Sequence, residues 1–180
     1  FLTYYDTVKF DEIYHHVSSD FINKKEVALF IIEYDHYYYF EKLSNDKRND
    51  DDILKAVCLS PLCIDEHVVA EFEHPLKFVK EGHHLLTNKI FAKDCVSNTG
   101  LALEYFPSFQ DDVDIAWLAI KSTHRSWCFE YLSNRLRNDF NTIVWALSCC
   151  TKDHISLDPM VRNYDDILDY TSKEYQEMFK

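Results

Sequence analysis

The chain has 180 residues, of which 47% are hydrophobic and 28% charged, a composition that excludes wholesale disorder and allows one ordinary domain with a buried core. Only two glycines are present, which excludes glycine-rich phosphate loops and dinucleotide-binding fingerprints. The net charge of −12 disfavours nucleic acid and membranes as partners, and it favours another protein with a basic or mixed surface.

A duplicated motif indicates that the chain contains repeats. The segment FEKLSNDKRND at 40–50 returns as FEYLSNRLRND at 129–139. Polar residues that can cap a helix recur in a related register, mostly about 26 residues apart. They are Asn23, Asn49, Asn88, Asp112, Asp139 and Asn163.

Each of these residues begins a segment whose fourth, seventh and eighth positions after it are apolar, except for Thr171 in the last segment, and these positions form one face of an α-helix. In chain order the six faces are Val27/Phe30/Ile31, Ile53/Ala56/Val57, Ala92/Cys95/Val96, Ala116/Ala119/Ile120, Ile143/Ala146/Leu147 and Ile167/Tyr170/Thr171. Carboxylates such as Asp51, Asp52 and Asp114 stand in the first turns, where the helix dipole favours negative charge.

Shorter apolar segments at 12–17, 37–43, 101–106 and 127–132 lie between these helices, each followed by a polar turn. Strand-like alternation does not persist, and the scarcity of glycine argues against tight β-hairpins. The sequence predicts an all-α fold, in which tandem helical hairpins of about 26 residues stack into a small solenoid-like or bundle domain.

We expect a single helical-repeat domain over 1–180. Its units lie near 12–36, 37–60, 88–111, 112–138 and 139–180, and an irregular insertion occupies 58–87. Because the first residue is Phe1 and not Met, we also expect a fragment of a longer protein.

The residues that follow Asn98 resemble a known family. Gly100, Ala102, Leu103 and Tyr105 begin the resemblance, and FEYLSNRLRND at 129–139 continues it. The stretch 98–147 resembles the short helical repeat called domain of unknown function 4116, and 12–57 resembles it less closely. The resemblance is lost over 58–87. The family brings no established activity, and its members look like effectors of intracellular bacteria and proteins of large viruses, which implies binding to a partner protein.

A run of aromatic residues is the predicted interaction surface. A helix buries only part of its circumference, so Tyr34, Tyr37, Tyr38 and their neighbours cannot all face one core. Exposed tyrosines suit a binding hot spot. The alternative is that neighbouring repeats bury them from both sides. With Glu41 and the insertion residues His67, His83 and His84, these tyrosines are the predicted protein-binding residues.

The insertion also permits a second hypothesis, an enzyme or zinc protein that uses cysteine and histidine. Its candidate ligands or catalytic groups are Cys58, Cys63, His67 and His83. Their spacing matches no standard zinc pattern, so we expect no cofactor, metal or catalytic residue. Inside the repeats, Cys95 and Cys128 occupy positions held elsewhere by alanine, which predicts small buried fillers.

The three tryptophans, Trp117, Trp127 and Trp145, stand next to the apolar face and are predicted to be core residues. We therefore expect a non-catalytic protein-interaction module in the cytoplasm with reduced thiols. It would regulate or inhibit a partner in a bacterial effector or viral system, and a secreted effector would act in the host cytoplasm. The other hypotheses are the cysteine–histidine enzyme or zinc protein and a structural spacer.

Overall fold

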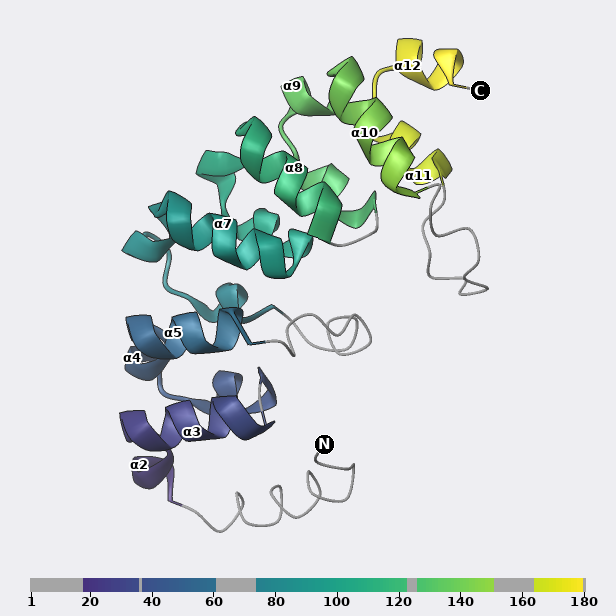
Figure 1. Ribbon diagram of the computed structural model, residues 1–180. Coiled ribbons are helices and arrows are strands. Elements are labelled where there is room, and N and C mark those ends of the chain that lie inside the picture. The colour runs from purple at the N-terminus through teal and green to yellow at the C-terminus, as the bar shows by residue number, and fades with distance from the viewer. Residues whose placement is uncertain (1–17, 36, 61–73, 123–125, 151–163, 180) are drawn as a thin grey trace. The chain divides into compact units, whose positions relative to one another are not determined.

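A computed structural model describes residues 18–35, 37–60, 74–122, 126–150 and 164–179. Within these ranges the chain is all-α, and no strand occurs (Figure 1). No helix among the described residues is long and apolar enough to cross a membrane. The predicted fold class is confirmed, whereas the stacking of hairpins into a solenoid stays a prediction.

The chain divides into two compact units, Phe1–His83 and His84–Lys180. The prediction of one domain over 1–180, with the proposed repeat limits, stays a prediction. The first unit contains α2 (Ser19–Ile22), α3 (Lys25–Asp35), η1 (Tyr37–Lys42), α4 (Asn45–Arg48), α5 (Asp51–Cys58) and η3 (Pro75–Phe78), where η marks a 3-10 helix.

The second unit has a similar order of short and long helices. Its elements are η4 (His84–Thr87), α7 (Lys89–Asn98), η5 (Gly100–Tyr105), η6 (Pro107–Phe109), α8 (Val113–Ser122), η7 (Ser126–Tyr131), α9 (Asn134–Arg137), α10 (Phe140–Cys150), α11 (Tyr164–Asp169) and α12 (Lys173–Met178). The described part of the predicted insertion, 58–60 and 74–87, holds two short 3-10 helices, η3 and η4, and the prediction of an irregular insertion over 58–87 stays a prediction.

The long helices begin at polar caps, as predicted for the second unit. Asn88 accepts the amides of Ile90 and Phe91 at the start of α7. Asp112 accepts those of Asp114 and Ile115 at the start of α8. Asp139 accepts the amide of Thr142. These bonds satisfy N–H groups that have no partner inside the helix.

In the first unit the predicted caps are one residue too early. Asn23 and Asn49 end the short helices α2 and α4, and the cap of α5 is Asp50. The buried face of α3 is accordingly Ala28, Ile31 and Ile32, whereas the predicted Phe30 is 53% exposed. The error arises because two polar residues stand side by side at each of these boundaries.

A corresponding shift corrects the face of α5, where Leu54, Val57 and Cys58 are buried and the predicted Ala56 is only half-buried. The last predicted helix is also shorter than expected, since α11 ends at Asp169 and Thr171 follows it. Its predicted cap, Asn163, lies outside the described residues.

The core of each unit combines a long-helix face with residues of the 3-10 helices. Phe40 of η1 is fully buried in the first unit, and Leu103 of η5 and Phe129 of η7 are fully buried in the second. Cys95 and Cys128 are completely buried and fill space, as predicted. Cys58, Cys95, Cys128 and Cys149 are thiols rather than disulfides in the described part of the chain.

Candidate interaction site

Two tryptophans form an exposed pair on the second unit. Trp117 of α8 and Trp145 of α10 stack with ring centroids 5.7 Å apart and an angle of 21° between the ring planes. Their exposed fractions are 45% and 37%. The prediction that these two residues belong to the core is therefore wrong, and the side chain of Trp127 lies outside the described residues.

The pair is exposed because of its position in each helix. Residues three, four, seven and eight positions after the cap form the buried face, and Trp117 stands five positions after Asp112. Trp145 stands six positions after Asp139. Val113, one turn before Trp117 on α8, is also exposed, so the apolar surface extends beyond the two rings along α8.

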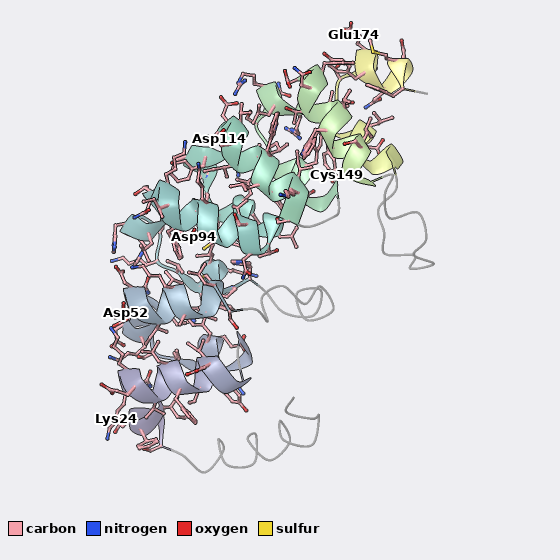
Figure 2. The ribbon with its side chains drawn as sticks, viewed as in Figure 1. Lys24, Asp52, Asp94, Asp114, Cys149 and Glu174 are labelled. Carbon is pink, nitrogen blue, oxygen red and sulfur yellow. The ribbon has the colours of Figure 1, made fainter. Side chains whose placement is uncertain are left out.

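Ion pairs join α8 to the neighbouring helix α7. Lys89 pairs with Asp112, and Lys93 lies 3.7 Å from Asp114, whose carboxylate is at the start of α8 (Figure 2). Burial acts to raise the pKa of Asp112, but the bond from Lys89 and the amides of Ile115 and Asp114 bring it below its ordinary value. Between α8 and α10 the two indole rings stack on each other.

The first unit has an open groove between α3 and α5, with a volume of about 570 Å³. Leu29 and Ile32 line it from α3, and Ala56 and Leu59 line it from the end of α5. Glu33, Asp52 and Lys55 add charge to the lining. Asp52 stands in the first turn of α5, where it binds the Lys25 ammonium at 2.6 Å (Figure 2).

The structure describes only part of the predicted protein-binding set. The side chains of Tyr34, Tyr37 and Tyr38, and all of His67, lie outside the described residues, so their roles stay predictions. Glu41 is exposed at the end of η1. The described residues of this set do not form the surfaces identified above.

His83 and His84 fall in different units. The ring of His83 lies 3.1 Å from the Asn49 carbonyl oxygen and 3.6 Å from the Asp51 carboxylate, and its side chain is only 10% exposed. These contacts attach the end of the first unit to the start of α5. His84 begins η4 and is exposed.

The alternative cysteine–histidine site is described at two of its four positions. Cys58 is buried in the core face of α5 and belongs to no cluster of three potential metal ligands within the described residues. The ring of His83 contacts the Asn49 carbonyl oxygen and the Asp51 carboxylate. Cys63 and His67 lie outside the described residues. The hypothesis therefore gains no support from the geometry of Cys58.

Sequence reasoning missed both the tryptophan pair as a surface and the groove. The register of the caps contains the signal for the pair, because positions five and six after a cap point away from the buried face. The groove has no comparable signal, since it arises where small side chains of two helices meet.

Comparison with known proteins gives one match. Residues 88–137 fit the model of the family described as "Domain of unknown function (DUF4116)". No curated protein and no solved structure matches the chain. The matched segment runs from the cap of α7 to the end of α9. Over residues 88–137 this chain is therefore similar to the domain of unknown function DUF4116, and the resemblance recognised in its sequence is confirmed over that part.

Proposed function

We propose that this protein is a non-catalytic protein-interaction module that regulates or inhibits a partner protein, in the cytoplasm, within a bacterial effector or viral system. The observation that supports the proposal is the stacked and half-exposed pair Trp117–Trp145. Tryptophan is enriched at the energetic centres of protein interfaces, where a large ring is removed from water with few rotors to freeze.

The surroundings of Trp117 also fit an interface. Val113 stands one turn before Trp117 on the same face of α8 and is 41% exposed. Exposed apolar residues that gather on a folded protein mark sites of association. The net charge of −12 favours a partner with a basic or mixed surface, since opposite charge speeds encounter and disfavours wrong partners.

The experiment compares partner capture by the wild-type protein and by the double variant Trp117→Ala/Trp145→Ala. Cross-linking and quantitative mass spectrometry of host lysate identify proteins that the wild type enriches. We expect the double variant to lose at least about tenfold in enrichment of the same protein, the effect of losing about 1.4 kcal/mol of binding free energy. The variant Ile90→Ala is a matched control, because Ile90 is an exposed apolar residue of α7 outside the pair.

The other hypotheses have distinct outcomes in parallel measurements. A structural spacer would enrich no partner with either protein. A zinc protein would carry stoichiometric metal that falls in a Cys63→Ser variant. Equal enrichment by the wild type and the double variant, with unchanged far-UV circular dichroism, would remove the tryptophan pair from the proposed interface.

A further inference from the structure

The groove of the first unit occupies the same helical positions as the tryptophan pair of the second unit. Leu29 stands five residues after Lys24, as Trp117 does after Asp112. Ala56 stands six residues after Asp50, as Trp145 does after Asp139.

The equivalence of these positions rests on the first backbone hydrogen bonds of the four helices. The amide of Ala28 donates to the Lys24 carbonyl at 2.9 Å, and the amide of Leu54 donates to that of Asp50 at 2.9 Å. In the second unit, Ala116 donates to Asp112 at 2.9 Å and Ile143 to Asp139 at 3.0 Å. All four donor residues are buried, so the two helix pairs share one register.

The groove is consequently the space that two indole rings fill in the equivalent helix pair. In α8 and α10 the rings of Trp117 and Trp145 stack across the helix boundary. In α3 and α5 the same positions carry the smaller Leu29 and Ala56, and a groove of about 570 Å³ remains. We propose that this groove receives an aromatic side chain of a partner protein, next to a basic residue of the same partner. This inference rests on the proposed function.

The charge of the lining favours a basic neighbour for the aromatic ring. Two carboxylates, Glu33 and Asp52, line the groove together with one ammonium, Lys55. Asp52 is already paired with the Lys25 ammonium at 2.6 Å, whereas Glu33 is exposed to solvent, and in residues 1–83 acidic residues outnumber basic ones by about two to one. A lysine or arginine of the partner would pair with Glu33, for which no ion pair occurs within the described part of the chain.

The shape of the groove favours a side chain presented by a protein over a small free ligand. Sites for small molecules enclose most of the ligand surface. This groove is open to solvent along the two helices, and its apolar floor is formed by Leu29, Ile32, Ala56 and Leu59. A partner surface can cover the open side, whereas a free molecule would leave that side in water.

The test uses capped dipeptides as probes and NMR spectra of the isotope-labelled full chain. N-acetyl-Arg-Trp-amide is compared with N-acetyl-Glu-Trp-amide, with N-acetyl-Arg-Ala-amide and with free indole, each at millimolar concentration. We expect saturable shift changes with the Arg-Trp probe at the amides of Leu29, Ile32, Ala56 and Leu59. The Glu-Trp probe should bind several-fold more weakly, and the Arg-Ala probe should not bind.

Two variants change the groove directly. Ala56→Trp places in the first unit an indole ring like that of Trp145 in the second unit. The ring should fill the groove and leave the fold unchanged, and the affinity for the Arg-Trp probe should fall at least tenfold. Leu59→Asn is the smaller change, in case Ala56→Trp disturbs α5. It makes the floor of the groove polar and should also weaken binding of the Arg-Trp probe. Ile90→Trp adds the same ring to an exposed position of α7 and should leave binding unchanged.

Several outcomes would overturn the inference. They are the absence of saturable shifts, equal shifts in both groove variants and the wild type, and free indole binding as tightly as the Arg-Trp probe. Self-association of the chain that Ala56→Trp abolishes would identify a second copy as the occupant and would also overturn it. If the probes fail while the Trp117/Trp145 variant still loses its partner, the proposed function stands and only the groove assignment falls.

Discussion

The side-chain oxygen of Asn138 accepts a hydrogen bond from the backbone N–H of Ser172 at 2.8 Å, and this bond joins the end of α9 to the start of α12. The amide group of the same asparagine donates to the Asn134 carbonyl at 2.8 Å, so it also closes its own short helix. One side chain thus satisfies two backbone groups that a helix end and a helix start leave without intrahelical partners.

The same relationship recurs in the first unit. Asn23 accepts from the amide of Ser44 at 2.8 Å, and Asn49 accepts from the amide of Lys80 at 2.8 Å. Each of these asparagines ends a one-turn helix, as Asn138 does. Asparagine is therefore required here for its combination of donor and acceptor, which an N-cap would not need.

We expect Asn138→Ala to lower the free energy of unfolding by about 1–3 kcal/mol, because partly buried backbone groups lose their partner. Asn138→Asp retains the acceptor for Ser172 but loses the donor to Asn134, so its effect should be smaller. Urea unfolding followed by circular dichroism measures both. Asn141→Ala, at an exposed position of α10, is the control and should stay within about 0.5 kcal/mol of the wild type. Equal stability of the Asn138→Ala and control variants would contradict the bridging role.

Stability should also depend on pH through His74. This residue caps η3, where its Nδ1 accepts the amide of Leu76 at 3.2 Å. Burial lowers the pKa of His74 from 6.5 to about 3. Between these values the unfolded chain binds a proton that the folded chain does not, so the contribution of His74 to stability falls as the pH falls through that window.

Because of this one group, the free energy of unfolding should be about 1.4 kcal/mol lower at pH 5.5 than at pH 7.5. Urea unfolding at the two pH values measures it, and His74→Asn is the matched variant. Asparagine keeps an oxygen acceptor for the Leu76 amide but does not titrate in this range. The wild type should therefore lose more stability on acidification than the variant. The same pH dependence in both proteins would show that His74 is not buried in its neutral form.

The charged pair Asp111–Arg135 provides a test that does not involve stability. Arg135 donates from Nε to both Asp111 carboxylate oxygens, at 3.0 and 3.1 Å, and the Ser133 hydroxyl donates to the same carboxylate. The bonds from Ser133 and from Arg135 lower the pKa of Asp111 below its usual 3.8. NMR titration of the carboxyl carbons should show this lowered pKa, with a rise toward the usual value in Ser133→Ala and in Arg135→Ala. An unchanged pKa in both variants would contradict the network.

The predicted helices and most of their buried faces follow from apolar spacing, and the correct caps Asn88, Asp112 and Asp139 show how far that signal reaches. The boundary errors come from adjacent polar residues. Spacing cannot distinguish an asparagine that ends one helix from an aspartate that begins the next, as Asn49 and Asp50 show. Asn49 also accepts a hydrogen bond from the distant Lys80 backbone N–H, a contact that no local sequence pattern records.

The candidate surfaces were less predictable for the same kind of reason. Trp117 and Trp145 look like core residues by type, and only the exact cap register places them outside the buried face. The groove between α3 and α5 depends on which side chains of two separate helices meet. Ala56 is inconspicuous in the sequence, and its small size matters only opposite Leu29.

The two indole rings should also be coupled energetically. Aromatic pairs contribute about 0.5–1.5 kcal/mol beyond the area that they bury, and the exposure of Trp117 and Trp145 places this pair at the low end. A double-mutant cycle of Trp117→Ala and Trp145→Ala, measured by urea unfolding, should give a coupling of about 0.5 kcal/mol or more. In the control cycle, Trp145→Ala with Ile90→Ala, the effects should add within about 0.3–0.5 kcal/mol, because no ring contact joins those residues. Additivity in both cycles would mean that the rings do not stack in solution, and the apolar surface would then consist of separate side chains.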